Sequence, residues 1–428
     1  MLKPVQLFLE EYHITGADIN PDSLVTAFIS EMDKGLEGGD SSLRMIPTFI
    51  EADNQFKTGV TVTAIDAGGT NFRAANVTFT NDGSMEMTEP ARHKMPGTDV
   101  EVSKEKFFNL IAGYVKELAK ETSSIGFCFS YPTEIFPNKD GKLLEFSKEI
   151  KAPEVIGEMI GENLLNTLGM NGKEIVLLND TVTTLLAGKS ASFDQEYDSY
   201  IGFILGTGTN TAYIESNEKI TKNSSLEPGR SQIINIESGA FGRAPRSGID
   251  LTFDAGTANP GQYPFEKMFS GGYFGGLAHT ALKMAAEEGF LSAESGSKLQ
   301  AADELTTEDA NLFLDQSSPG RGPLMNCLVT EEDRIAATEI MQALVSRAAT
   351  LVAANLAAVI LKTGRGKSPE KPVLITVEGT AYYKLHGLKS QIEAVLEEYL
   401  SGDHRRYYAF TYVDQSSLVG AALAALIE

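Results

Sequence analysis

The alternation of apolar runs and amphipathic segments predicts a mixed α/β chain. In the first half, the pattern predicts three strands that are followed by alternating helices and strands. The expected strands are 60–66, 71–80, 84–91, 123–130 and 174–179, and the expected helices are 103–120, 154–168 and 181–190. The order of elements in this half is therefore βββαβαβα.

A similar order returns in the second half of the chain. The expected strands are 199–206, 209–216, 231–237, 372–377 and 405–413, and the expected helices are 333–362, 386–400 and one that begins at Ser416. Residues 240–330 are rich in glycine, proline and acids, and they are expected to be an insertion in this half. The repeated order indicates a duplicated unit.

Each half begins with two strands joined by a turn of glycine and threonine that ends in asparagine. The first turn lies in "IDAGGTNF" (65–72) and the second in "ILGTGTNT" (204–211). Glycines let the backbone approach a phosphate, and two such turns facing each other would hold a polyphosphate. Either turn alone is also explained as a simple chain reversal.

Two aspartates stand beside the expected turns. Asp66 precedes the first glycine pair, where it would suit Mg²⁺ or would cap the turn. Asp180 lies between a buried strand and a helix in "LLNDTVTTLLAG" (177–188). It is explained either as a helix cap or as a general base for phosphoryl transfer to a hydroxyl.

Charge narrows the function classes. The 428 residues contain 36 basic and 58 acidic side chains, a formal net charge of −22. Such a surface repels nucleic acid and anionic membranes, so neither is expected as a partner. No stretch of about 20 uninterrupted apolar residues predicts a membrane helix. A bound nucleotide would need backbone N–H groups, a cation and a few basic side chains at its phosphates.

Cysteine and histidine add no chemistry of their own. Cys128 and Cys327 are far apart and show no metal or disulfide spacing, so we expect buried thiols and a cytoplasmic protein. The five histidines show no metal spacing either.

Polar residues at other chain reversals match what the hydroxyls of a sugar require. They are Ser130, Ser147, Lys148, Asn179, Glu237 and Glu266.

From about residue 42 almost to the end, the chain resembles the hexokinase family of eukaryotic-type hexokinases and glucokinases. Nine blocks match in order. They include "IDAGGTNFR", "GFCFSYPTE", "SKEIKA", "LLNDTVTTLLAG", "GFILGTGTNTAYIE", "NIESGAFG", "NPGQYPFEKMFSGGYFG", "VEGTAYYKLH" and "SSLVGAALAAL".

The resemblance implies a role for particular residues. Asp180 would take the proton from the 6-hydroxyl of a hexose. The sugar would be held by Ser130, Ser147, Lys148, Asn179, Asp180, Asn210, Glu237 and Glu266. Nucleotide and phosphate would be met by Asp66, Gly68, Gly69, Thr70, Asn71, Arg73, Lys94, Gly206, Thr207, Gly208, Gly379 and Thr380. Mg²⁺ with ATP would be bound by Asp66 and Asp180, through water.

The resemblance also implies the two-lobed duplicated fold shared by actin and hexokinase, with a cleft between the lobes. The small lobe is expected at 58–190 with the terminal helix 416–428, and the large lobe at 1–57 and 191–415. The expected reaction is phosphorylation of a hexose, with glucose favoured, by a cytoplasmic monomer or homodimer that has only small-molecule substrates.

Four departures from the family pattern are relevant. Ser147 stands where the family usually has threonine, and Glu378 where it usually has aspartate. Ser416 and Leu418 stand where glycines are common. The last three concern the nucleotide side, so nucleotide preference does not follow from the resemblance.

Three alternatives remain open from the sequence. An ATPase related to actin or to the heat-shock chaperones shares the paired turns, but it gives no reason for Ser130, Lys148, Glu237 and Glu266. A sugar sensor would bind without catalysis, although retention of Asp180 argues against it. A bacterial glucokinase of the repressor-related type is the third alternative, but the Cys-rich zinc segment of that type is absent from the sequence. Glucose-dependent release of ADP would separate these alternatives.

Overall fold

The first of two large β-sheets is formed by the first half of the chain. The computed structural model describes residues 2–51, 56–82, 84–146, 150–190, 195–315 and 322–427. The strand order of this sheet is β4-β3-β2-β6-β9, and β5 also pairs with β3. The strands are β2 (Thr61–Gly68), β3 (Asn71–Phe79), β4 (Met85–Met87), β5 (Ala91–Lys94), β6 (Ser124–Phe129) and β9 (Glu174–Leu178).

The second sheet repeats this arrangement. Its order is β1-β12-β11-β10-β13-β14, so the five strands after β1 follow the same path as the first sheet. Strands β4-β3-β2 of the first sheet and β12-β11-β10 of the second are antiparallel. Strands β2-β6-β9 and β10-β13-β14 are parallel. The strands are β1 (Ile46–Pro47), β10 (Ser199–Leu205), β11 (Thr209–Ser216), β12 (Ser231–Asn235), β13 (Val373–Glu378) and β14 (Tyr408–Thr411). The expected duplication and fold class are therefore confirmed.

Three expected elements differ from those observed. The strand expected at 84–91 is split into β4 and β5, because Pro90 lacks the N–H that a continuous ladder needs. The helix expected at 154–168 begins only at Ile160, after Gly157 in a left-handed conformation. The strand expected at 405–413 is confined to β14. A short hairpin of β7 (Thr133–Ile135) and β8 (Gly141–Leu143) was not expected.

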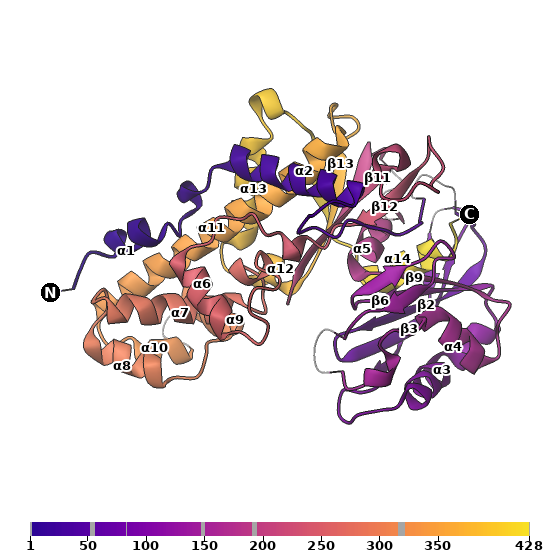
Figure 1. The fold of residues 1–428 in the computed structure, drawn as a ribbon, viewed down its shortest axis with the longest axis horizontal. Helices are drawn as coiled ribbons and strands as arrows, with labels where there is room; N and C mark the ends of the chain where they lie inside the picture. The colour runs from indigo at the N-terminus through magenta and orange to yellow at the C-terminus, as the bar shows by residue number, and fades with distance from the viewer. Residues whose placement is uncertain are drawn as a thin grey trace.

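Helices cover the outer faces of both sheets. The first sheet is covered by α3 (Lys104–Lys120) and α4 (Ile160–Leu168), and the second by α11 (Glu331–Thr363) with α2 (Pro21–Glu37) and α13 (Leu388–Tyr399) (Figure 1). Helix α11 is long and apolar enough to cross a membrane, but 89% of its most apolar stretch is buried inside the protein. It therefore acts here as the central helix of a core.

The insertion after β12 is largely helical. It contains the helices α6 (Gly248–Gly256), α7 (Phe274–Glu287), α8 (Ala293–Ala301), α9 (Thr307–Leu314) and α10 (Pro323–Cys327). These helices form the end of the molecule that also carries α1 (Val5–Tyr12) in Figure 1. Apolar side chains from the insertion join those of α11 in one continuous core.

Two helices lie between the sheets. Helix α5 (Asp180–Ser190) ends the first half but packs on β10, β11 and β13 of the second sheet. Helix α14 (Ser416–Ala424) ends the second half and packs on β2, β3 and β6 of the first sheet (Figure 1). The return of the terminal helix to the first sheet agrees with the expected lobes, whose residue boundaries stay a prediction.

Close contact between backbones joins these helices. An alanine Cβ at Gly420 would lie 1.9 Å from the carbonyl oxygen of Thr183 in α5. An alanine Cβ at Gly126 in β6 would lie 1.8 Å from the carbonyl oxygen of Ala421. Neither position has room for any side chain, because backbone atoms cannot rotate away as a flexible side chain can. The position of α14 therefore depends on glycine at these two contacts.

We expect Gly420→Ala to destabilise the protein by about 1–3 kcal/mol or more, because the added methyl group must push α14 away from α5. Gly113→Ala in α3 is the matched control, since its Cβ would meet nothing within 4 Å. There, loss of glycine in a helix interior should stabilise by about 0.5–1 kcal/mol. Urea titrations followed by circular dichroism measure both changes. Equal stabilities of the two variants would contradict the close-contact interpretation.

Candidate active site

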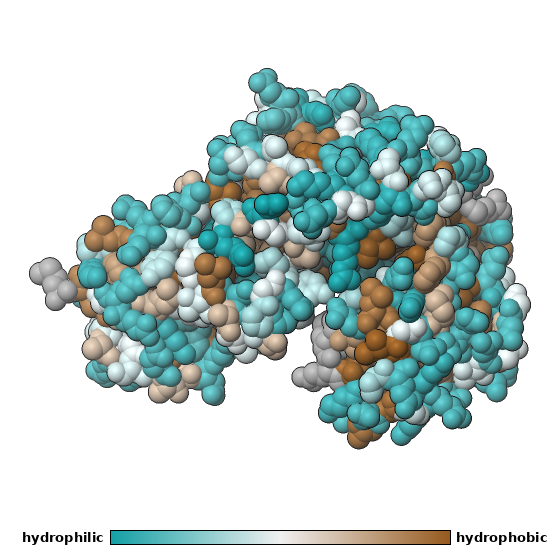
Figure 2. Space-filling view, in the orientation of Figure 1, coloured by the Kyte–Doolittle hydropathy of each residue, from teal (hydrophilic) through white to brown (hydrophobic). Residues whose placement is uncertain are grey.

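The predicted site residues gather where strands of both sheets end. The carboxyl ends of the parallel strands of each sheet face the same region, which is where α/β proteins bind ligands. Figure 2 shows the surface hollowed between the part of the molecule that carries α3 and α4 and the part that carries α9. Predicted residues directly at the strand ends are Gly68, Ser130, Asn179, Gly206, Glu237 and Gly379.

Asp180 is the first residue of α5, directly after β9. The Oδ1 atom of Asn179 accepts a hydrogen bond from the backbone N–H of Thr181 at 2.9 Å, so Asn179 performs the capping that the sequence allowed for Asp180. The Asp180 carbonyl oxygen accepts the hydroxyls of Thr183 and Thr184 at 2.6 and 2.9 Å. These bonds fix the backbone of Asp180. Because Asn179 caps the helix, the carboxylate of Asp180 is not needed for capping.

Asn210 connects the two sheets at the site. Its Oδ1 atom accepts backbone N–H groups of Thr211, Glu237 and Ser238 at 2.7, 3.0 and 3.2 Å. Its Nδ2 atom donates to Asn235 Oδ1 at 2.7 Å, and it lies 3.4 Å from Asn179 Oδ1. One amide thus joins the end of β12 in the second sheet to the end of β9 in the first.

Glu237 is held in a strained, half-buried position. Its backbone is left-handed, with φ of 62°, which is uncommon for a residue with a side chain and is typical of functional sites. Burial raises the pKa of its carboxyl, the nearby charge of Asp180 adds to this, and the bond from Asn235 opposes it. Asn235 Nδ2 donates to Glu237 Oε1 at 2.7 Å. Asn235 was not among the predicted site residues, although it ends β12 two residues before Glu237.

Glu266 reaches the second phosphate turn. Its Oε2 atom accepts the backbone N–H of Thr209 at 2.8 Å. The neighbouring Lys267 is buried, and its ammonium donates to Asp254 at 2.5 Å and to the Asn259 carbonyl at 2.7 Å. Lys267 thereby fixes the loop that leads to Glu266. This supporting role of Lys267 had no signal in the sequence.

The first phosphate turn contains a cross-strand ion pair. Arg73 donates through Nε and Nη2 to Asp66 Oδ2 at 2.9 and 2.5 Å, and the two residues are direct partners on β2 and β3. Burial raises the pKa of the Asp66 carboxyl, although the charge of Arg73 opposes this. The Tyr131 hydroxyl donates to the Gly69 carbonyl at 2.7 Å and fixes the turn from the side of β6.

The second phosphate turn is fixed by the segment after Glu266. Backbone N–H groups of Gly271 and Gly272 donate to the carbonyls of Gly206 and Thr207 at 2.7 and 2.8 Å. Gly379 lies against this turn with φ of 117°, and a Cβ there would lie 2.3 Å from the Leu205 carbonyl. Only glycine fits such an approach, so the second and third predicted nucleotide contacts form one surface.

Two of the departures from the family pattern lie together. The Ser416 hydroxyl donates to Glu378 Oε2, and the Thr184 hydroxyl approaches the same oxygen at 3.4 Å. Burial raises the pKa of the Glu378 carboxyl, and the charges of Asp180 and Asp66 raise it further. Glu378 is therefore close enough to both aspartates to feel their charges. Leu418, the third departure on the nucleotide side, is buried in the core between the sheets.

The remaining predicted residues divide into three groups. Thr70 and Asn71 follow Gly69 at the β2–β3 turn. Lys94 pairs with Asn71 across the strands, but its exposed ammonium lies 3.1 Å from Asp99. Ser147 and Lys148 lie outside the described residues. Both cysteines are buried and free, as expected, and burial raises the pKa of the Cys128 thiol well above its ordinary value.

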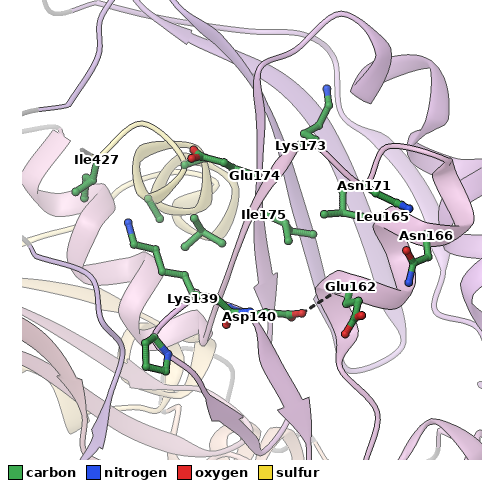
Figure 3. A pocket seen from close by; sticks show the side chains of 15 residues that line it. Lys139, Asp140, Glu162, Leu165, Asn166, Asn171, Lys173, Glu174, Ile175 and Ile427 are labelled. Carbon is green, nitrogen blue, oxygen red and sulfur yellow. Dashed lines mark hydrogen bonds between the residues drawn. The ribbon is translucent and has the colours of Figure 1, made fainter. Parts of the chain in front are cut away.

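A cavity of about 600 Å³ lies elsewhere, at the outer edge of the first sheet (Figure 3). It is lined by residues of β9, α4 and the end of the chain, and none of the predicted site residues contributes to it. Asp140 in this cavity accepts the N–H groups of Gly161 and Glu162 at 2.7 and 2.9 Å, which caps α4. Its carboxylate therefore has a structural role, and the candidate active site is the cluster of strand ends.

Known proteins are similar to this chain over nearly its whole length. Family models described as hexokinase match residues 4–190 and 200–427. Glucokinase-1 of Saccharomyces cerevisiae is 29% identical over 490 residues, covering 100% of this chain and 97% of that protein. Hexokinase-7 of Oryza sativa subsp. japonica is 28% identical over 437 residues, covering 94% of this chain and 92% of that protein.

Solved structures show the same fold. A hexokinase from Schistosoma mansoni, complexed with glucose, aligns with a TM-score of 0.77 at 23% identity, over 99% of this chain and 98% of that one. A second structure described as a hexokinase aligns with a TM-score of 0.79 at 22% identity, over 98% of both chains. The two-lobed hexokinase and actin-like fold is therefore that of this chain.

The raised pKa of Glu237 gives a pH-dependent prediction. Because the folded state binds this proton more tightly than the unfolded state, the charged Glu237 carboxylate destabilises the fold at pH values above its ordinary pKa of 4.5. We expect Glu237→Gln to be more stable than the parent protein at pH 8, and the difference to shrink as the pH falls towards 4.5 and to be lost below it. Urea titrations over this range measure it. Glu86→Gln on exposed β4 is the control, and an equal gain there, or a gain at Glu237 that does not change with pH, would contradict the prediction.

Proposed function

We propose that this chain, which belongs to the hexokinase family, transfers a phosphoryl group from ATP to the 6-hydroxyl of glucose. Membership of the family makes the protein an ATP-dependent hexose kinase that acts in the first step of glycolysis. The choice of glucose, the 6-hydroxyl and the individual site residues are the finer parts of the proposal.

One observation carries the assignment of the site. Asp180 stands at the start of α5 with its capping role taken by Asn179, and Asn210 joins that point to Glu237 across the two sheets. If this cluster served only to cap α5, Asn179 alone would be enough. Amides and carboxylates arranged around one aspartate match the alternating donors and acceptors of sugar hydroxyls.

The proposed chemistry assigns Asp180 the proton. As the 6-oxygen forms its bond to the terminal phosphorus of ATP, the bond from that phosphorus to the bridging oxygen breaks, and the hydroxyl proton passes to the Asp180 carboxylate. Asn179, Asn210, Glu237 and Glu266 hold the other hydroxyls, so the acceptor oxygen is oriented before transfer. Backbone N–H groups of the turns at 68–71 and 206–208 meet the phosphates.

The residues present fit Mg²⁺. Asp66, Asp180 and Glu378 lie close enough for their charges to raise one carboxyl pKa, which is a surplus of negative charge that a cation relieves. Among the described residues, no group of three or more potential ligands forms a ready metal cage. Asp66 and Asp180 would therefore hold the ion through water, with ATP phosphates as the other ligands. When bound, Mg²⁺ would neutralise charge that develops on the transferred phosphoryl group.

We also propose a cytoplasmic monomer or homodimer with small-molecule substrates only. The two buried free thiols support a reducing compartment. A single assay separates the proposal from a sugar sensor or an ATPase: ADP release should depend on glucose and should yield glucose 6-phosphate. ATP turnover that is independent of sugar, or sugar binding without turnover, would refute the proposed function.

We expect Asp180→Asn to lower kcat by about 10²–10⁴-fold, because the amide cannot accept the hydroxyl proton. Affinity for glucose should change by only a few-fold, since the amide keeps the shape of the side chain. A coupled assay of ADP release measures kcat, and calorimetry measures glucose binding. Asp82→Asn, in the loop after β3, is the control and should leave both unchanged. Retention of more than a tenth of the parent kcat would show that Asp180 is not the base.

We expect excess chelator to reduce turnover to background and added Mg²⁺ to restore it. In Asp66→Asn, the Mg²⁺ concentration for half-maximal rate should rise about tenfold, which corresponds to about 1.4 kcal/mol of lost charge interaction. Glucose affinity should stay unchanged. Initial rates over a Mg²⁺ titration at saturating ATP measure this. Full activity in chelator would remove the metal from the mechanism, and an unchanged Mg²⁺ titration would remove Asp66 from the metal site.

A further inference from the structure

Two exposed tyrosines stand together beside the third nucleotide contact. Tyr383, in α12 (Thr380–Lys384), is 40% exposed, and Tyr412, directly after β14, is 57% exposed. Their ring centroids are 5.6 Å apart and their planes meet at 82°. The two rings therefore form an open aromatic corner at the carboxyl ends of the neighbouring parallel strands β13 and β14.

Contacts of Tyr383 hold the corner in place. The Tyr383 hydroxyl donates to the Val377 carbonyl at 3.1 Å, and the ring of the buried Tyr382 packs edge-on at 4.9 Å. Lys389 places its ammonium 5.6 Å from the centroid of the Tyr383 ring. A fixed aromatic ring at the surface costs little further ordering when a flat ligand binds to it.

The corner adjoins the predicted nucleotide loop. Tyr383 lies three residues after Thr380, and Gly379 contacts Gly206 of the second phosphate turn, where an alanine Cβ would lie 3.4 Å from Gly379 Cα. Burial raises the pKa of both tyrosines, and the charge of Glu378 contributes to each shift. Both rings therefore lie within electrostatic reach of the carboxylate at the end of β13.

We propose that Tyr383 and Tyr412 form the stacking platform for the nucleobase of the phosphoryl donor. The inference rests on the proposed function, because it adds a base site to the phosphate turns already assigned. Every base has a flat π-face, so stacking on tyrosine binds bases with little discrimination among them. The Lys389 ammonium beside the platform also lies 3.8 Å from a carboxylate oxygen of Glu393, so the platform offers an aromatic surface to the base, and the phosphates are left to the two turns.

The proposal makes a distinct statement about nucleotide preference. Adenine and guanine nucleotides should both gain from the platform, whereas a polyphosphate without a base should gain nothing. Docking of another protein on the same exposed rings is the competing explanation. It predicts that loss of the rings leaves nucleotide binding unchanged.

The test compares ATP, GTP and inorganic tripolyphosphate, each with Mg²⁺ and without sugar, by titration calorimetry. Because the two rings are nearly perpendicular, a base can stack on one of them and meets the other edge-on. Tyr383→Ala and Tyr412→Ala should therefore each raise the Kd for ATP and for GTP, and the larger of the two increases should be about 5- to 150-fold, the range for loss of one stacked base. The Kd for tripolyphosphate should change less than about twofold, because the lost contact is with the base alone. Tyr412→Phe should bind ATP as the parent does, since it keeps the ring.

Tyr399→Ala is the matched control, because this tyrosine lies at the far end of α13 and contacts Asp22 and His404 instead. It should leave all three affinities unchanged. Melting curves verify that every variant is folded. We expect this result because Tyr383 and Tyr412 are exposed. Unchanged ATP binding in both alanine variants, or an equal loss of tripolyphosphate binding, would overturn the platform.

The same titrations separate this inference from the proposed function. If the parent protein fails to phosphorylate glucose but the alanine variants lose ATP binding, the proposed function fails and the platform stands. If glucose is phosphorylated but ATP binds the parent no better than tripolyphosphate does, the platform fails and the proposed function stands.

Discussion

The close crossing of α5 and α14 between the two sheets is the contact on which the geometry of the site depends. Each half of the chain ends in one of these helices, and each helix packs mainly on the sheet of the other half. Gly420 lets the two backbones meet at the Thr183 carbonyl. Because α5 begins with Asp180 and α14 begins with Ser416, this crossing brings the proposed base and the nucleotide side together. A looser crossing would separate Ser416 from Glu378 and both from Asp180.

Buried negative charge is the cost of this arrangement. Burial raises the pKa of the Asp66, Glu237 and Glu378 carboxyls, so each negative charge is less favourable here than it would be in water. Arg73 offsets part of the cost at Asp66, and amide donors offset part of it at Glu237. Among the described residues, the charge of Arg44 also opposes the raised pKa of Glu237. The cost that remains is the physical reason why the proposed divalent ion and the donors of a sugar suit the site, and why these carboxylates make the fold less stable than neutral side chains would.

The nucleotide side shows how departures from a family pattern can depend on each other. Glu378 and Ser416 are separate substitutions in the sequence, but the serine hydroxyl donates to the longer carboxylate, and Thr184 of α5 approaches the same oxygen. Beyond them, Tyr383 and Tyr412 supply aromatic surface at the ends of β13 and β14. The phosphate turns thus follow the family pattern in form, while Glu378, Ser416 and Leu418 beside them depart from it.

The sequence alone determined the order of strands and helices along the chain, the duplication, the two glycine turns and the placement of Asp180 at a strand end, because these depend on local periodicity and on the backbone freedom of glycine. It also indicated Asn179, Glu237 and Glu266 at chain reversals, while Asn210 followed only from the resemblance to the family. It could not reveal that Asn179 caps α5 in place of Asp180, or that Asn235 supports Glu237, because a side-chain partner is chosen by distance in space. The splitting of the strand expected at 84–91 followed from one proline within an otherwise suitable pattern. The contacts of Ser416 with Glu378 and of Tyr383 with Tyr412 join segments about 30 to 40 positions apart, and only the pairing of β13 with β14 and the crossing of α14 over α5 brought them together.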